Sequence, residues 1–203
     1  MTGAPPWILE IRRRLEREWA VPDIVREIAE GTPDARPAAV LVPLYVRDGE
    51  LWTLFTKRSE AVEHHKGQIA FPGGLEALDD PTPWDTAVRE TEEEIGVPRK
   101  AILRLGELPE VVTFTGFRIR PFVGAIPYPF DFEHDPREVE SLLQVPIRAL
   151  LAPTLVEERQ VTWKGRRVAT PVFHLKGQVI WGATAFLVSA LLAALVDEAK
   201  PQG

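Results

Sequence analysis

The chain has 203 residues, enough to bury one sizeable core, and its 45% hydrophobic and 27% charged residues are typical of an ordinary globular protein. The formal net charge of −6 argues against a broad surface for nucleic acid or for an anionic membrane, because each needs an excess of positive charge. The lack of cysteine excludes a disulfide framework, a thiolate metal site and a thiol nucleophile.

Residues 1–35 predict an N-terminal helical extension. Apolar side chains recur at helical spacing over residues 7–19, which indicates an amphipathic helix, and a second short helix is expected to end at Gly31. No linker long enough to divide the remaining chain is present, so residues 36–203 are expected to form one domain. The apolar positions of the first helix are Ile8, Ile11, Leu15 and Trp19.

The middle of the chain predicts mostly β-strands. A hairpin is expected around Asp48-Gly49, and a further extended run covers residues 67–74. Beyond an acidic stretch, residues 101–180 are rich in extended segments, with turns at Lys164-Gly165 and Lys176-Gly177 and one short helix. This order favours an α/β or α+β layered domain, in which a mixed sheet carries one central helix and has helices at both ends.

An uncharged run of eighteen residues, 179–196, reaches the threshold length for a membrane span. It divides at Trp181-Gly182, and the helical part that follows is too short to span a bilayer, so it predicts a buried helix or a homodimer contact. Because no signal-peptide pattern surrounds Arg12, Arg13 and Arg14, we expect a cytoplasmic location and no membrane partner. The absence of asparagine, the single methionine and the 19 prolines are typical of a thermophile.

The acidic stretch contains a helix start signal at residues 82–85. Thr82 can act as the N-cap, Pro83 suits the first helical position, and Asp85 occupies the third position, as in a capping box. On a helical wheel of about 100° per residue, one face carries most of the apolar side chains and is expected to pack on the sheet. That face consists of Trp84, Ala87, Val88, Thr91 and Ile95.

Glu90, Glu93 and Glu94 fall together within an arc of about 100° beside that face, whereas Glu92 points to the far flank. Acidic helix faces are common, but like charges at these spacings destabilise a helix, so a merely solvated face does not explain the crowding. Three carboxylates do form an oxygen-only site suited to Mg²⁺ or Mn²⁺. The Gly73-Gly74 turn would let the backbone approach the same ions, with the carbonyl of Gly74 as a further ligand.

These residues resemble the Nudix box, the metal-binding loop and helix of hydrolases that cleave nucleoside diphosphates linked to another moiety. The family pattern is G-x5-E-x7-R-E-U-x-E-E-x-G-U, where U is aliphatic. The chain departs from this pattern in three ways. Asp80 replaces the first glutamate, and eight rather than seven residues separate it from Arg89. Thr91 occupies an aliphatic position. The matching residues are Gly74, Arg89, Glu90, Glu93, Glu94, Gly96 and Val97. The resemblance implies the Nudix fold, a mixed β-sheet between helices with a catalytic loop-helix.

Residues 54–74, LFTKRSEAVEHHKGQIAFPGG, resemble the signature of one Nudix branch, the coenzyme A pyrophosphatases. The one-residue insertion in the box is also similar to that branch, and further similar stretches extend the resemblance over roughly residues 36–185. The chain departs from the branch at Glu63, where arginine is usual, and at Ala77, which replaces an aspartate. The matching residues are Thr56, Arg58, Ser59, His65, Gly67, Gln68, Phe71 and Pro72.

The resemblance implies a metal-dependent hydrolase that cleaves the diphosphate bond of coenzyme A or its derivatives, giving 3′,5′-ADP and 4′-phosphopantetheine. Glu90, Glu93 and Glu94 would be the catalytic residues that hold Mg²⁺ or Mn²⁺, and Glu93 is the candidate for the base that takes a proton from the attacking water. The residues expected to contact this small-molecule nucleotide substrate are Arg58, His65 and Gly73.

Two further acidic positions enter the expected site. The family precedent implies a structural ion pair between Arg89 and Asp80, and Glu138 resembles a downstream carboxylate that serves as an extra metal ligand or base, although an exposed loop acid fits equally well. Two alternatives for the function stay open. One is a Nudix hydrolase of ADP-ribose or another nucleoside diphosphate derivative, and the other is a Nudix-like binding module without turnover.

Overall fold

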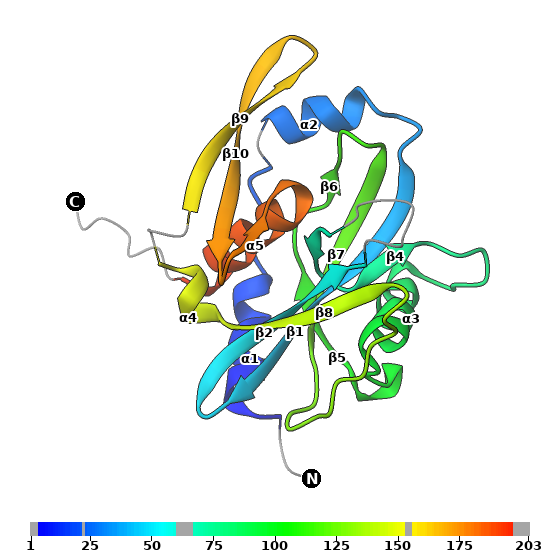
Figure 1. Ribbon diagram of the computed structural model, residues 1–203, viewed down its shortest axis with the longest axis vertical. Helices are drawn as coiled ribbons and strands as arrows, with labels where there is room; N and C mark the ends of the chain where they lie inside the picture. Colours follow the sequence, from blue (N-terminus) through cyan, green and yellow to red (C-terminus); the bar gives the residue numbers. More distant parts are fainter. Residues whose placement is uncertain (1–3, 22, 60–66, 153–155, 197–203) are drawn as a thin grey trace.

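The computed structural model describes residues 4–21, 23–59, 67–152 and 156–196. These residues form a large mixed β-sheet with helices on both faces and a smaller antiparallel sheet beside the last helix (Figure 1). The sequence predicts a layered α/β architecture with a mixed sheet between helices, and this prediction is confirmed. The boundary expected between residues 35 and 36 stays a prediction.

The large sheet has eight strands in the described residues, with the central order β3-β2-β1-β7-β5. β1 runs parallel to β7 and antiparallel to β2, and β4, β6 and β8 pair with β1, β7 and β2. The β1–β2 hairpin turns at Asp48 and Gly49, whose φ angles of 51° and 77° are those of the predicted tight turn. The strands are β1 (Arg36–Arg47), β2 (Glu50–Arg58), β3 (Ile69–Ala70), β4 (Gly73–Leu75), β5 (Leu103–Glu107), β6 (Val111–Val112), β7 (Phe117–Ala125) and β8 (Val139–Pro146).

The smaller sheet has the strand order β11-β10-β9, and all its pairs are antiparallel. Its strands are β9 (Val156–Trp163), β10 (Arg166–Leu175) and β11 (Gln178–Ile180). The two connecting turns contain Lys164-Gly165 and Lys176-Gly177, and all four residues have positive φ. The turns predicted at these positions are therefore confirmed, because glycine adopts this conformation without steric cost.

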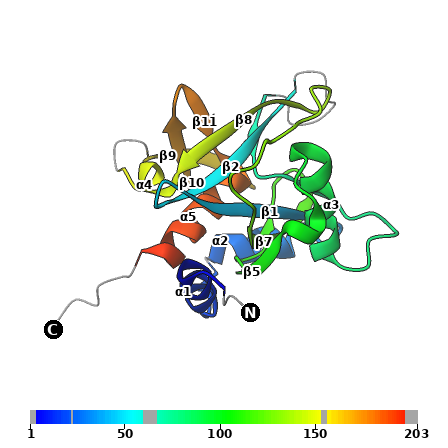
Figure 2. The same ribbon diagram turned by 90° about the horizontal axis from the view of Figure 1, so that it is seen from below.

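Hydrophobic clusters lie on both faces of the large sheet. Successive side chains of a strand point to opposite faces, and in β1 Leu41 and Tyr45 join one cluster while Val42 and Leu44 join the other. Helix α3 completes the first cluster, and α1 and α5 complete the second (Figure 2). The helices are α1 (Pro6–Leu15), α2 (Asp23–Glu30), α3 (Pro83–Ile95), the 3-10 helix η1 (Arg99–Ala101), α4 (Ile147–Leu150) and α5 (Gly182–Leu195).

The first helix is shorter than its hydrophobic periodicity predicts. The expected helix includes Trp19, but α1 ends at Leu15, so this part of the prediction is wrong. Arg14 donates a hydrogen bond to the carbonyl of Leu195 (2.7 Å), and Arg17 donates one to the carbonyl of Ala193 (2.9 Å). These arginines bind the carbonyls at the C-terminal end of α5, where cationic donors are favourable, and so join the end of α1 and the residues after it to α5.

The apolar C-terminal segment forms α5, which packs against β10, α1 and α4. Ala185, Leu187, Val188 and Leu191 are buried in this way, so contacts within one chain account for much of the apolar surface. The homodimer and the cytoplasmic location stay predictions. Within the described part of the chain, no helix combines the length and the hydrophobicity that crossing a bilayer requires.

Candidate active site

Helix α3 begins and ends at local signals that the sequence carries. The Thr82 hydroxyl accepts a hydrogen bond from the backbone N–H of Asp85 (3.3 Å), and Pro83 occupies the first turn, as predicted. The helix ends at Gly96, whose φ of 75° is left-handed and whose N–H donates to the carbonyl of Glu92. These caps fix the length and position of the helix that carries the acidic residues.

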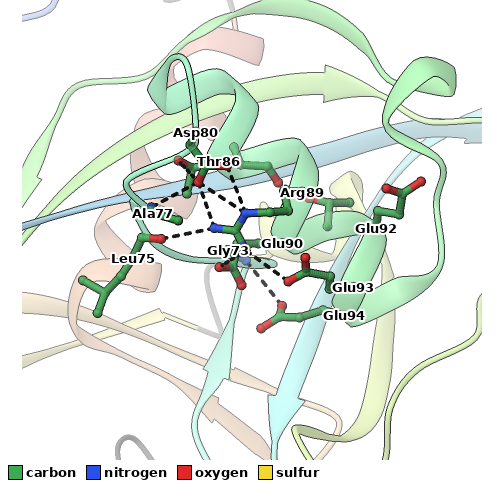
Figure 3. Close-up of polar contacts among 12 residues, drawn as sticks. Gly73, Leu75, Ala77, Asp80, Thr86, Arg89, Glu90, Glu92, Glu93 and Glu94 are labelled. Atoms are coloured by element: carbon green, nitrogen blue, oxygen red, sulfur yellow. Dashed lines mark hydrogen bonds and ion pairs between the residues drawn. The ribbon is translucent and has the colours of Figure 1, made fainter.

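The rotational position of α3 follows from its buried face. Ala87, Val88, Thr91 and Ile95 are buried against the sheet, where α3 packs on β1 and β4. Trp84 is half-buried and meets the edge of Phe122 with ring centroids 5.5 Å apart. Because this face is fixed, Glu90, Glu93 and Glu94 are directed toward the Gly73-Gly74 strand, and Glu92 points away (Figure 3).

An ion pair joins the loop before α3 to the middle of the helix. The Arg89 guanidinium donates to both carboxylate oxygens of Asp80, at 2.9 Å for the closest contact, and also to the carbonyl of Leu75 (Figure 3). The hydroxyl of Thr86 and the N–H of Ala77 donate to the same carboxylate. The hydrogen bonds from Arg89 hold the pKa of Asp80 well below its usual range. The predicted Arg89–Asp80 pair is present, and it fastens the loop to the helix.

Arg89 also reaches two of the three predicted catalytic glutamates. One of its terminal nitrogens lies 2.7 Å from Oε1 of Glu90 and 3.0 Å from Oε2 of Glu93. Burial raises the pKa of Glu90 against the opposing effect of Arg89, whereas half of the Glu93 side chain, 51%, is exposed. Glu93 is therefore the member of the trio that meets solvent most freely.

Glu94 is the deeply buried member, with only 3% of its side chain exposed. It accepts a hydrogen bond from the N–H of Gly73 (3.3 Å) and lies 3.4 Å from the Arg58 guanidinium at the end of β2. Burial raises the pKa of Glu94 to about 8, although the positive charge of Arg58 acts in the opposite direction. A carboxyl so perturbed at the edge of a polar cluster is typical of a functional site rather than of a solvated face.

The two glycines allow the backbone to lie against these carboxylates. A Cβ atom on Gly74 would lie 2.5 Å from the carboxyl carbon of Glu90, and one on Gly73 would lie 2.4 Å from the carbonyl oxygen of Ala39. Any larger residue at Gly74 would displace the Glu90 side chain. The backbone of the Gly73-Gly74 turn therefore lies beside the carboxylates, and the approach to metal ions that the sequence predicts stays a prediction.

The donor set fits a hard divalent cation in its chemistry. Glu90, Glu93 and Glu94 offer carboxylate oxygens, the ligands that Mg²⁺ and Mn²⁺ prefer, and the absence of a Cβ at Gly74 leaves its backbone beside them. In the described residues, however, no three Asp, Glu or His side chains surround a common point. The cations that neutralise the carboxylates here are the guanidinium groups of Arg89 and Arg58.

The structure places some expected residues at the site and adds others. Arg58 lies at the site, Gly73 donates to Glu94, and His65 lies outside the described residues. The charge of Glu138 contributes to raising the pKa of both Glu90 and Glu94, and its role as a metal ligand or base stays a prediction.

Arg99 is a residue that sequence reasoning missed. Its guanidinium contacts Glu92 (2.7 Å) and lies 3.9 Å from Glu93. Its position just beyond the helix end is the only signal that the sequence offers.

Comparison with known proteins agrees with this geometry. The NUDIX domain model matches residues 35–163. The chain is 33% identical over 156 residues to proteins named uncharacterized Nudix hydrolase NudL from Yersinia pestis (strain Pestoides F) and Yersinia pseudotuberculosis serotype O:1b (strain IP 31758), covering 77% of this chain and 78% of theirs. The crystal structure of a MutT/nudix family protein from Enterococcus faecalis is similar in fold, with a TM-score of 0.53 at 14% identity over 93% of this chain and 74% of that one. With its capped acidic helix, its glycine turn and these relatives, the chain belongs to the Nudix hydrolase family, whose members cleave nucleoside diphosphate derivatives.

Proposed function

We propose that this Nudix hydrolase cleaves the diphosphate bond of coenzyme A or its derivatives to 3′,5′-ADP and 4′-phosphopantetheine. The observation that supports this most strongly is the segment at residues 54–74, which resembles the coenzyme A branch and leads directly into the site. Its Arg58 lies against the buried Glu94, and its Gly73 donates to the same carboxylate. The residues that resemble the branch signature are therefore beside the residues that resemble the Nudix box.

Glu90, Glu93 and Glu94, with the carbonyl of Gly74, would hold Mg²⁺ or Mn²⁺. When bound, such ions neutralise a diphosphate and lower the pKa of a coordinated water. The three carboxylates lie on one side of α3, toward the glycine strand, and two of them are mostly buried. A metal ion could replace the guanidinium groups that pair with these carboxylates, because guanidinium groups and divalent metal ions both bind carboxylate oxygens.

Glu93 is the proposed base. Its side chain is 51% exposed, against 17% for Glu90 and 3% for Glu94, so an attacking water reaches it most directly. Arg89 contacts one of its oxygens at 3.0 Å and thereby limits its rotation. In the proposed reaction Glu93 accepts the proton of the water that attacks phosphorus, and the leaving phosphate departs on the opposite side.

Arg58 is the proposed contact to the substrate phosphate. Its Nε–H is buried and has no hydrogen-bond partner among the described residues, while Nη1 contacts Glu94 at 3.4 Å. An unpaired buried donor on a cation costs free energy, so a phosphate oxygen at this position would be stabilised. The other proposed contacts are the backbone of Gly73 and His65. His65 is proposed on the resemblance alone.

A Nudix hydrolase of ADP-ribose or another nucleoside diphosphate derivative is the second candidate. The departures at Glu63 and Ala77 favour it, because the first removes a cation that the coenzyme A branch usually carries. A binding module without turnover is disfavoured, since binding alone would not require the complete set of Glu90, Glu93 and Glu94.

A substrate panel tests the proposal. Purified protein with Mg²⁺ or Mn²⁺ is incubated with coenzyme A, dephospho-coenzyme A, ADP-ribose, NADH and diadenosine polyphosphates, and products are separated by chromatography. We expect cleavage of coenzyme A and comparable cleavage of the dephospho form, with Glu63→Arg shifting the preference toward coenzyme A. Cleavage of ADP-ribose alone would establish the second candidate, and the absence of metal-dependent turnover on every compound would favour a binding module.

A further inference from the structure

The connection between β7 and β8, together with β8 itself, lines an open surface hollow of about 440 Å³. This volume lies within the usual range of small-molecule pockets, about 300–1,000 Å³. None of the candidate site residues described above lines it. The hollow is lined by residues that include Phe130, Asp131, Phe132, Leu142 and Gln144.

The hollow is adjacent to the carboxylate site. Leu142 of β8 pairs with Thr56 of β2, and Arg58 lies two residues further along β2, where it pairs with Val139 of β8 beyond a shift in register. Leu142 also packs in the cluster beneath α3, and so shares the face of the sheet on which Arg58 meets Glu94. A ligand whose phosphates lie at Arg58 could therefore extend into the hollow within the length of a nucleotide.

The connection that lines the hollow also passes close to the end of α3. A Cβ atom on Gly96, the residue that ends α3, would lie 3.2 Å from the carbonyl oxygen of Glu133 in the connection. Figures 1 and 2 show this connection passing α3 before it enters β8. Glu133 lies between two lining residues of the hollow, so the hollow lies near the end of the helix that carries Glu93 and Glu94.

The chemistry of the lining suits a planar, uncharged and hydrogen-bonding group. Phe130 and Phe132 are half-buried, with ring centroids 5.3 Å apart and planes tilted by 58°, so a flat group can stack on only one of them. Phe132 also packs against Tyr45, with ring centroids 6.1 Å apart, which leaves Phe130 as the ring for stacking. The polar lining residues in the described chain are Asp131, His134, Ser141 and Gln144, with no lysine or arginine, and the carboxylate of Asp131 disfavours a phosphate in the hollow. Stacking of a base on an aromatic side chain is stabilising and tolerates different bases.

Gln144 adds a directional contact. The hydroxyl of Tyr45 donates to its Oε1 (2.8 Å), which fixes the orientation of the amide. The second lone pair of Oε1 and the N–H groups of Nε2 then remain as an acceptor and donors side by side. A glutamine amide in this arrangement pairs with the N6 amino group and N7 of adenine.

We infer that the hollow is the subsite for the adenine base of the substrate, with Phe130 stacking on the ring and Gln144 binding its edge. This inference rests on the proposed function, because coenzyme A and ADP-ribose both join adenosine to the diphosphate. It goes beyond that function by assigning the base to residues 130–144, far in sequence from the Nudix box and from the segment at residues 54–74.

Photolabelling of the unmodified protein tests the subsite directly. The probe is 8-azidoadenosine 5′-diphosphate, which carries the adenylate part common to both candidate substrates, and labelled peptides are mapped by mass spectrometry. We expect label within residues 127–146 that coenzyme A and ADP-ribose suppress and that 4′-phosphopantetheine leaves unchanged. Label confined to other peptides, no saturable label, or protection by 4′-phosphopantetheine in place of the adenine compounds would overturn the inference.

A matched pair of variants tests it kinetically. With whichever adenine substrate the panel identifies, Phe130→Leu is expected to raise KM at least tenfold with kcat within about twofold, since a stacking contact acts on ground and transition states alike. Phe114→Leu changes an exposed phenylalanine outside the hollow and should leave both constants unchanged. Equal KM values for the two variants would contradict the subsite. The photolabelling result does not depend on turnover, so a failure of the proposed function and a failure of this inference are distinguishable.

Discussion

Two glutamates of α3, two residues apart, have opposite environments. The Glu94 side chain is 3% exposed, meets the N–H of Gly73 and the guanidinium of Arg58, and has a pKa that burial raises to about 8. The Glu92 side chain is 40% exposed and pairs with Arg99 in solvent. An exposed ion pair contributes at most about 1 kcal/mol to stability. Burying a charged carboxylate lowers stability unless the charge is paired. The comparison separates the functional flank of the helix from its solvated flank.

The largest effect is expected from Glu94→Gln, which removes the ionisable carboxyl group from the buried flank while preserving the shape of the side chain. Turnover of the preferred substrate should fall at least about a hundredfold, equivalent to about 2.7 kcal/mol of transition-state stabilisation. Steady-state kinetics measures the loss, and circular dichroism should show an unchanged fold. A variant that keeps more than half of the activity would show that Glu94 is buried for structural reasons only.

Asp80→Asn tests whether the network behind the functional flank is architectural. Removing the charge that Arg89 binds should lower the free energy of unfolding by about 2 kcal/mol at pH 7, as expected for hydrogen bonds to a charged group. Urea unfolding measures this loss.

The same variant has a defined pH dependence. The pKa of Asp80 is lowered in the folded protein, so its contribution is complete above the unfolded value of about 3.9 and disappears as the pH falls toward the folded value. The difference between the native protein and Asp80→Asn should therefore shrink below about pH 4. A difference that is constant from pH 7 to pH 3 would contradict a charge-based role.

Gly74→Ala tests the functional flank of α3 by a change in the strand that faces it. The new Cβ would lie 2.5 Å from the carboxyl group of Glu90, a flexible side-chain end that can move, so the fold should persist. The displaced carboxylate should lower turnover by about tenfold or more, because displacements near 1 Å are costly in a catalytic site. Leu75→Ala, at the next and exposed position, serves as the control and should retain activity.

The smallest effect is expected from Glu92→Gln on the solvated flank. Turnover should change by less than about twofold, and stability by less than about 1 kcal/mol, because only the exposed pair with Arg99 is lost. The same kinetic and urea experiments measure both quantities. If this variant were as inactive as Glu94→Gln, the two flanks would not differ in function, and Arg99 would have to act on Glu93.

Local physical chemistry explains which features could be predicted from the sequence. Thr82 and Gly96 cap α3 through hydrogen bonds within four residues, and the hairpin at Asp48-Gly49 depends on φ angles that few residues adopt. The helical period then places Glu90, Glu93 and Glu94 on one flank once the buried face is known.

Contacts between segments far apart in the chain determine the features that could not be predicted from the sequence. Arg58 reaches Glu94 from a strand 36 residues away, and Gln144 is oriented by Tyr45 across 99 residues. Arg14 and Arg17 bind the carbonyls at the end of α5. The sequence by itself determined the capped helix, the turns, the carboxylate flank and the family resemblance, because each depends on residues close together in the chain. The tertiary structure alone decided the burial and pKa of Glu94, the exposure of Glu93 and the hollow beside β8, because desolvation and charge pairing depend on segments that only folding brings together.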